Sequence, residues 1–147
     1  KKNSLCHNFV QDNKSFSSKG VLRGLHFQLP PFEQVKLVEC SYGKILDIAV
    51  DLRRSSNTFG QYKSTILSHE NKLKLYIPAG FAHGFIVLSD FAYFSYKVSN
   101  FYNKDFDSGI FWNDQDLNID WTLNKNEIII SNKDKSLSSF REFENPF

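Results

Sequence analysis

The stretch Val35–Leu52, VKLVECSYGKILDIAVDL, decides the fold of this chain. From Leu46 to Leu52 every second side chain is apolar, and the side chains between them are Asp, Ala and Asp. A period of two is typical of a β-strand with one buried face. Gly43 lies in a short turn segment between this run and the apolar run Val35–Cys40, which is a hairpin signal. The stretch therefore predicts a β-hairpin whose second strand is half-buried.

Similar apolar runs along the chain predict an all-β fold. They recur at intervals of roughly 8–12 residues, which is the spacing found in sandwiches and barrels. Only Ser131–Asp134, which has the form of a capping box, indicates a helix, and that C-terminal helix is short. No linker or change of composition divides residues 1–147, so we expect a single domain. The further predicted strands are Tyr62–Leu67, Lys72–Ile77, Phe85–Leu88 and Phe91–Val98.

The composition limits the partners and the compartment. The chain has 147 residues, 41% of them hydrophobic, and a net charge of +2, which argues against a nucleic-acid or membrane surface. No apolar run reaches the roughly 18 residues of a membrane helix. Cys6 and Cys40 cannot form a disulfide framework, so we expect a buried free thiol at Cys40 and a cytoplasmic protein. Because the chain lacks methionine, we expect a fragment without its N-terminal portion.

Four polar side chains occur in apolar segments that are predicted to be strands. The segment Gly20–Gln28, GVLRGLHFQ, sets Arg23 and His26 among small and apolar residues. Lys36 and Tyr96 each share a strand face with two apolar neighbours. The Lys36 ammonium then either faces the interior, where it needs a partner, or snorkels at a strand edge. An imidazole base, a cation beside an enolate and a phenol that returns a proton suit proton abstraction next to a carbonyl.

Motifs spread in order over almost the whole chain resemble those of one known family. They are Gln11–Asn13, Gly20–Gln28, Asp51–Arg54 with Ser56–Gly60, Ile77–Phe85, Tyr96–Lys97, and Trp112–Asp114 through Ile119–Trp121. The family is that of the dTDP-4-dehydrorhamnose 3,5-epimerases. The resemblance implies a double-stranded β-helix, which is the cupin-type jelly-roll barrel, and a homodimer without metal or cofactor. It further implies that the N-terminal strands of the family precede Lys1 and are missing here.

The resemblance also implies a substrate and a reaction. The substrate would be a nucleotide-diphosphate 4-keto-6-deoxy sugar, and the reaction would convert dTDP-4-dehydro-6-deoxyglucose to dTDP-4-dehydrorhamnose. His26 would be the base, Tyr96 the proton donor, and Lys36 the cation beside the C4 oxygen. Asp134 would pair with His26 and fix its tautomer, although Asp134 is also the third residue after the cap of the predicted helix. The implied substrate contacts are Gln11, Asn13, Arg23, His83, Phe101, Tyr102, Asp107 and Lys133.

Two of these contacts have a specific chemical expectation. The Arg23 guanidinium suits a diphosphate, which it can hold through paired hydrogen bonds, and Phe101 would stack on the nucleotide base. His83 lies in a Pro-x-Gly-x-x-His element that recurs in cupin barrels, where this histidine often binds metal. The His-x-His pair of such sites is replaced here by His26-Phe27-Gln28. We therefore expect no metal site.

The position of Arg23 relative to His26 raises a geometric difficulty. In a regular strand, residues separated by an odd number of positions point to opposite faces. The resemblance nevertheless places both side chains in one pocket. Gly24 lies between them and could permit a bulge or bend. We therefore expect an irregular strand at Gly24.

Several other functions remain open on the sequence alone. One is a mono-epimerase that inverts C3 or C5, and another is a keto-isomerase on a related nucleotide sugar. A third is a metal-dependent oxygenase on the same barrel. A fourth, from a different class, is a non-catalytic module that binds sugar nucleotides.

Overall fold

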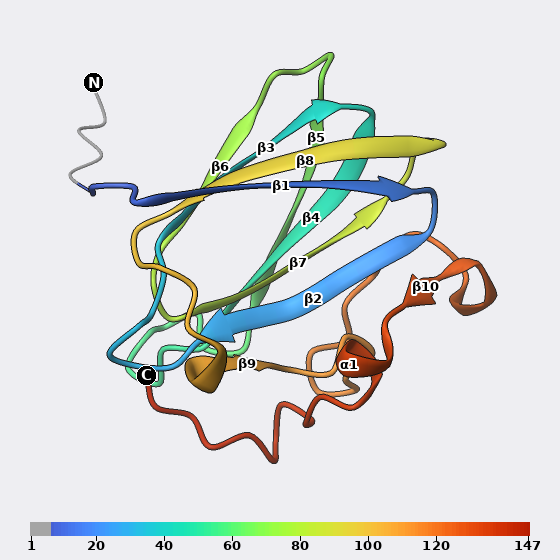
Figure 1. The fold of residues 1–147 in the computed structure, drawn as a ribbon. Helices are drawn as coiled ribbons and strands as arrows, with labels where there is room; N and C mark the ends of the chain where they lie inside the picture. Colours follow the sequence, from blue (N-terminus) through green and yellow to red (C-terminus); the bar gives the residue numbers. More distant parts are fainter. Residues whose placement is uncertain (1–6) are drawn as a thin grey trace.

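In the computed structural model, which describes residues 7–147, two β-sheets face each other (Figure 1). One sheet contains, in spatial order, β1 (Gln11–Ser18), β8 (Phe91–Val98), β3 (Lys36–Tyr42) and β6 (Lys74–Ile77). The other contains β10 (Ile129–Ile130), β2 (Val21–Gln28), β7 (Phe81–Val87), β4 (Lys44–Asp51) and β5 (Tyr62–Ser68), with β9 (Asp107–Gly109) beside β2. All strand pairs are antiparallel except β10 with β2. This is the predicted all-β jelly roll.

Helical structure is confined to short segments in the described residues. Two 3-10 turns, η1 (Lys104–Phe106) and η2 (Lys125–Glu127), precede the helix α1 (Asn132–Lys135). The predicted short helix is confirmed, because Ser131 caps it by accepting a hydrogen bond from the backbone N–H of Asp134. Within residues 7–147 no helix has the length and apolarity that a membrane crossing requires.

The predicted hairpin between the two strands of Val35–Leu52 is wrong. β3 pairs with β6 and β8 in one sheet, whereas β4 pairs with β5 and β7 in the other. The turn at Gly43 therefore carries the chain from one sheet to the other. Gly43 has a φ of +79°, and a Cβ there would lie 2.2 Å from the carbonyl oxygen of Phe91. Only glycine fits this corner.

The predicted half-burial of β4 is also wrong, because both of its faces are buried. Ile45 and Ala49 belong to a core between the two sheets. Leu46, Ile48 and Val50 belong to a second core on the outer face of the β2–β7–β4 sheet. Residues 110–147 form the third layer that covers this face (Figure 1). The layer includes Leu117, Trp121, Phe140, Phe143 and Phe147.

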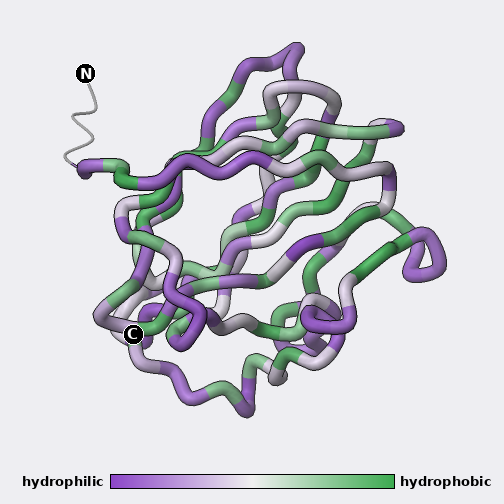
Figure 2. The backbone as a smooth tube through the Cα atoms, viewed as in Figure 1, coloured by the Kyte–Doolittle hydropathy of each residue, from purple (hydrophilic) through white to green (hydrophobic). Residues whose placement is uncertain are grey.

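The apolar runs in the sequence predict most of the remaining strands. The apolar runs appear as β3, β5, β6, β7 and β8 with shifted ends, β7 starting at Phe81 rather than Phe85. β1 was not predicted as a strand, since its sequence QDNKSFSS is mostly hydrophilic (Figure 2) and contains one apolar residue, Phe16. Cys40 carries the expected buried free thiol, whereas Cys6 lies outside the described residues.

Candidate active site

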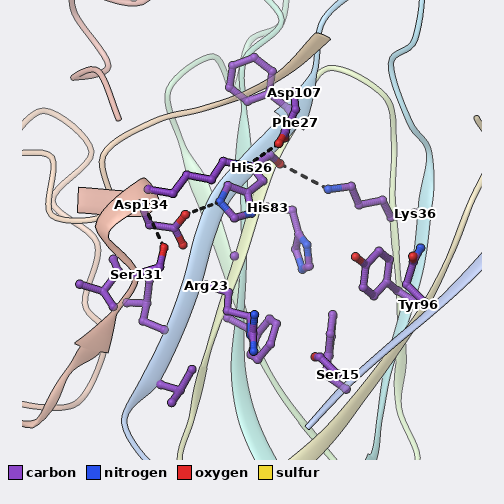
Figure 3. A pocket seen from close by; sticks show the side chains of 18 of the residues that line it. Ser15, Arg23, His26, Phe27, Lys36, His83, Tyr96, Asp107, Ser131 and Asp134 are labelled. Carbon is purple, nitrogen blue, oxygen red and sulfur yellow. Dashed lines mark hydrogen bonds and ion pairs between the residues drawn. The ribbon is translucent and has the colours of Figure 1, made fainter. Parts of the chain in front are cut away.

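A cavity of about 650 Å³ opens between the sheets, beside the interior core. Arg23 and His26 of β2 and His83 of β7 line it from one sheet (Figure 3). Lys36 of β3 and Tyr96 of β8 line it from the facing sheet. Residues close in space here lie far apart in sequence, because neighbouring strands of each sheet come from distant parts of the chain.

Gly24 breaks the regularity of β2, as expected. The register of β2 with β7 shifts between Arg23 and His26, and Gly24 has a φ of +133°. A Cβ on Gly24 would lie 2.5 Å from the Cα of Gly84 in β7. Gly24 and Leu25 are therefore both buried, and the flanking Arg23 and His26 both face the cavity. The prediction that a bulge brings these two side chains into one pocket is confirmed.

His26 and Asp134 form a carboxylate–imidazole pair. Nε2 of His26 lies 2.8 Å from Oδ1 of Asp134, and the Asp134 side chain is 4% exposed against 32% for His26. The backbone N–H of Gly24 donates to the second carboxylate oxygen at 3.2 Å. Burial alone would raise the pKa of Asp134, but the hydrogen bond and charge of His26 bring it below its usual range. Asp134 is therefore an anion that directs the His26 ring.

Lys36 faces the interior, which settles the alternative left open by the sequence. It is 7% exposed, and its Nζ donates to the carbonyl oxygen of His26 at 3.4 Å. Burial lowers the pKa of Lys36 to about 8, against the attraction of Asp47 and Asp107. The ammonium is thus a desolvated cation beside the base, suited to stabilise a nearby negative charge.

Tyr96 lies on the wall opposite His26 (Figure 3). Its ring packs against Phe94 with a centroid distance of 5.4 Å, on the face predicted by alternation. Burial raises the pKa of the Tyr96 phenol, while the charge of Arg23 opposes the rise and that of Asp107 adds to it. The phenol is therefore protonated near neutral pH and can donate a proton.

His83 is paired with a second carboxylate, that of Asp47 in β4. Nε2 of His83 lies 2.9 Å from Oδ2 of Asp47, and both side chains are buried. Alternation within β4 grouped Asp47 with the solvent-facing positions, so this residue was missed. The signal that finds it is a carboxylate in a strand buried on both faces. Residues 7–147 contain no group of three or more His, Cys, Asp or Glu side chains placed to hold a metal ion.

The mouth of the cavity is bridged by a charged cluster. Asp107 accepts hydrogen bonds from the Tyr102 hydroxyl at 2.9 Å and from the Lys133 ammonium. The bond to Asp107 raises the pKa of both partners. Tyr102 and Lys133 are more than half exposed, while the Asp107 side chain is 12% exposed. The cluster joins β9 to α1 and so borders the helix that holds Asp134.

Two predicted contacts lie beside the cavity rather than in its wall. Phe101 is 66% exposed and is held through its carbonyl by Gln28 Nε2 at 3.2 Å. Gln11 accepts from the Tyr102 backbone N–H at 2.9 Å and donates to Asn13 at 2.8 Å. The predicted residues that do line the cavity are Asn13, Arg23, His26, Lys36, His83, Tyr96, Tyr102, Asp107, Lys133 and Asp134.

Ser15 is a further wall residue that sequence reasoning missed. It lies in β1, whose polar sequence does not predict a strand, and its Oγ is buried with no hydrogen-bond partner among residues 7–147. No pattern in the sequence marks this hydroxyl, because β1 contains four serine or asparagine side chains of similar character.

Similarity to known proteins agrees with this geometry. The profile described as dTDP-4-dehydrorhamnose 3,5-epimerase matches residues 1–142. The chain belongs to this epimerase family. The family member from Shigella flexneri is 56% identical over 126 residues, which cover 86% of this chain and 68% of the relative.

Solved structures of the epimerase family superpose closely on this chain. The crystal structure of dTDP-4-dehydrorhamnose 3,5-epimerase from Elizabethkingia anophelis has a TM-score of 0.92 at 52% identity, covering 94% of this chain and 75% of that one. A Legionella pneumophila epimerase in complex with dTDP-4-keto-L-rhamnose has a TM-score of 0.91 at 45% identity, covering 95% and 73%. The family resemblance and the jelly-roll fold inferred from the sequence are confirmed.

Proposed function

We propose that this chain is a 3,5-epimerase that converts dTDP-4-dehydro-6-deoxyglucose to dTDP-4-dehydrorhamnose. One observation carries the proposal: the His26–Asp134 pair faces a desolvated Lys36 and a protonated Tyr96 across a single cavity. A base, a cation and an acid on opposite walls are what inversion of a carbon next to a carbonyl requires. The bound sugar nucleotide of the Legionella pneumophila relative supports the substrate.

The base in the proposed reaction is His26. With a proton on Nε2, directed at Asp134, the lone pair of the other ring nitrogen is free to accept a proton. His26 removes the proton from C3, the C–H electron pair forms an enolate, and the negative charge develops on O4. The Lys36 ammonium stabilises that oxygen, and Asp134 stabilises the imidazolium.

Tyr96 completes the inversion from the opposite face. Its phenol donates a proton to C3 as the enolate collapses back to the ketone, and the same cycle then runs at C5 after the sugar ring moves. The phenolate regains a proton and His26 loses one through exchange with water. Each cycle transfers protons only, so it needs no oxidant or reductant, and the Lys36 ammonium supplies the positive charge beside O4. The proposed enzyme therefore uses no cofactor.

The mouth of the cavity would bind the nucleotide diphosphate. Arg23 and Lys133 supply positive charge there, and the exposed Phe101 ring can stack on a base, with Tyr102 beside it. A stacking ring accepts the face of any base, so thymidine is supported by the relatives rather than by Phe101. The other proposed substrate contacts are Gln11, Asn13, His83 and Asp107.

Deuterium incorporation tests this function. The protein is incubated in heavy water with dTDP-4-dehydro-6-deoxyglucose and, in parallel, with other nucleotide 4-keto-6-deoxy sugars. We expect deuterium at both C3 and C5, no incorporation by a His26→Asn variant, and normal incorporation by His69→Asn, which changes a histidine outside the cavity. Deuterium at one carbon would identify a mono-epimerase, and binding without any exchange would identify a non-catalytic module.

We also propose a homodimer and a cytoplasmic location. One patch of aromatic rings is at least 40% exposed and consists of Phe16, Tyr42, Phe91 and Tyr93. Phe16 packs against Phe91 and Tyr93, and Phe91 also stacks on Tyr42. A second copy of the chain on this patch would bury apolar surface. The free thiol of Cys40 is compatible with a reducing compartment. Sedimentation equilibrium measures the oligomeric state, and a monomer at micromolar concentration would contradict the first proposal.

A further inference from the structure

Asp47 is a fully buried carboxylate behind the wall of the cavity. It lies on β4 and is 0% exposed. Its Oδ2 contacts Nε2 of His83 at 2.9 Å, and its Oδ1 has no hydrogen-bond partner in the described part of the chain. A buried carboxylate with an unpaired oxygen costs stability, because the lost hydration is not replaced. Asp47 is thus an unfavourable residue for the fold alone.

Two other buried aspartates show what a structural carboxylate does in this chain. Asp51, four residues further along β4, accepts hydrogen bonds from the side chains of Arg53, Ser56 and Thr58. Asp114 accepts three backbone N–H bonds with both oxygens. Both tie loops together and lie away from the cavity. The charge of Asp47 acts instead on two cavity residues, His83 and Lys36.

We propose that Asp47 is a positioning residue of the epimerisation: it holds His83 in one orientation and tautomer, and it supplies the negative charge that balances the Lys36 ammonium. The inference rests on the proposed function, because His83 and Lys36 are substrate-facing residues there. It adds a role for a residue that does not touch the cavity itself.

The contacts of His83 support the first half of this role. The Nε2 atom is held by Asp47, and the ring stacks near Phe94 of the facing sheet with a centroid distance of 5.8 Å and an interplanar angle of 26°. A carboxylate acceptor at Nε2 favours the tautomer with the proton on that atom. The other ring nitrogen of His83 then presents a defined hydrogen-bonding state to the sugar.

The surroundings of Lys36 support the second half. The titratable side chains that line the cavity around Lys36 include His26 from β2, His83 from β7 and Tyr96 from β8. Asp134 of α1 also lines the cavity but is paired with His26. The charges that oppose the lowering of the Lys36 pKa by burial are those of Asp47 from β4 and Asp107 from β9. Asp107 already binds Tyr102 and Lys133 at the mouth. Asp47 is therefore the counter-charge on the dry side of the cavity.

Two substitutions at Asp47 separate its role in holding His83 from its role in balancing the charge of Lys36. Asp47→Asn removes the charge but keeps an oxygen that can accept from His83. Asp47→Glu keeps the charge but displaces the carboxylate from His83 by one methylene. Asp51→Asn is the matched control, since it neutralises a buried carboxylate on the same strand outside the cavity.

The Lys36 titration is followed by NMR of the full chain labelled with ¹³C at lysine Cε, and turnover is followed across pH. We expect D47N to lower the Lys36 midpoint from about 8 by roughly one to three units, and the alkaline limb of kcat/KM to move with it. We expect D47E to keep the midpoint but to lose about 100-fold in kcat, as a misplacement of about 1 Å does. D51N should leave the midpoint unchanged.

The outcomes separate this inference from the proposed function. A Lys36 midpoint that does not move in D47N overturns the charge role, whatever the turnover. A wild-type kcat in D47E overturns the role of Asp47 in holding His83. If D47N does not fold, D47E alone still decides whether Asp47 holds His83. A wild-type protein that fails to exchange deuterium at either carbon overturns the epimerase proposal instead, while the NMR titration still reports on Asp47 and Lys36.

Discussion

Replacing Lys36 by methionine should make the protein more stable and less active. Burial lowers the pKa of Lys36 from 10.5 to about 8, a difference of about 2.5 units. At 1.36 kcal/mol per unit, holding the ammonium in the folded state costs about 3 kcal/mol at pH 7. Methionine fills similar volume without charge, but it removes the hydrogen bond that Lys36 Nζ donates to the carbonyl oxygen of His26, which reduces the gain by about 1–2 kcal/mol. Since the pKa of about 8 already includes the attraction of Asp47, we expect K36M to add a net stability of about 1–2 kcal/mol.

The pH dependence of this difference follows from the direction of the pKa shift. Below about pH 8 Lys36 is charged in both the folded and the unfolded state, so the full cost is present. Between pH 8 and 10.5 the folded state loses the proton while the unfolded state keeps it, and the cost declines with rising pH. The stability advantage of K36M should therefore be largest below pH 8 and should disappear above about pH 10.5.

Thermal unfolding at pH 7 and pH 10.5 measures the stability gain of K36M and its dependence on pH, and a turnover assay measures its kcat. We expect K36M to raise the Tm by about 3–6 °C at pH 7 and to lower kcat by roughly 10²–10³-fold. Lys97→Met is the control, because Lys97 neighbours Leu37 in the same sheet but is 51% exposed. It should change stability by less than about 0.5 kcal/mol and leave kcat unaltered. A K36M protein less stable than wild type at pH 7 would refute the argument.

Three further substitutions test the remaining parts of the site. Gly24→Ala should destabilise the fold by roughly 3 kcal/mol or more, measured by urea unfolding, because a Cβ would lie 2.5 Å from Gly84 Cα and φ is +133°; a loss below 1 kcal/mol would contradict the close approach. Tyr96→Phe should lower product formation about 10²–10⁴-fold while His26 still exchanges the substrate proton for deuterium; loss of exchange as well would place Tyr96 elsewhere in the reaction. Asp134→Asn should lower kcat with little change in KM, and an unchanged kcat would deny Asp134 a role in orienting the base.

The sequence predicts this fold well where neighbours along the chain decide the structure. Alternation located β3, β5 and β8 to within a few residues, and the cap at Ser131 located α1. It failed where distant segments decide. β4 is buried on both faces because residues 110–147 cover its outer side, and no window within β4 contains that information.

The candidate site divides in a similar way. Lys36 and Tyr96 face the cavity as their strand positions predict, and Gly24 provides the bulge that joins Arg23 to His26. Asp47 was missed, since it shares a face of β4 with Ile45 and Ala49 and its burial depends on the facing sheet rather than on its own strand. The family roles of His26 and Asp134 came from resemblance, because no local rule links residues 108 positions apart.

The contact between Gly24 and Gly84 has a consequence for engineering the substrate range. Two backbones meet there without side chains between them, and the register pairs His26 directly with His83 nearby. The contact between the backbones of β2 and β7 therefore fixes the spacing between these two histidines. A mutant library that varies Phe101, Tyr102 and the rest of the rim could therefore alter which nucleotide is accepted while the base stays in place. The two glycines are the positions such a library should leave untouched.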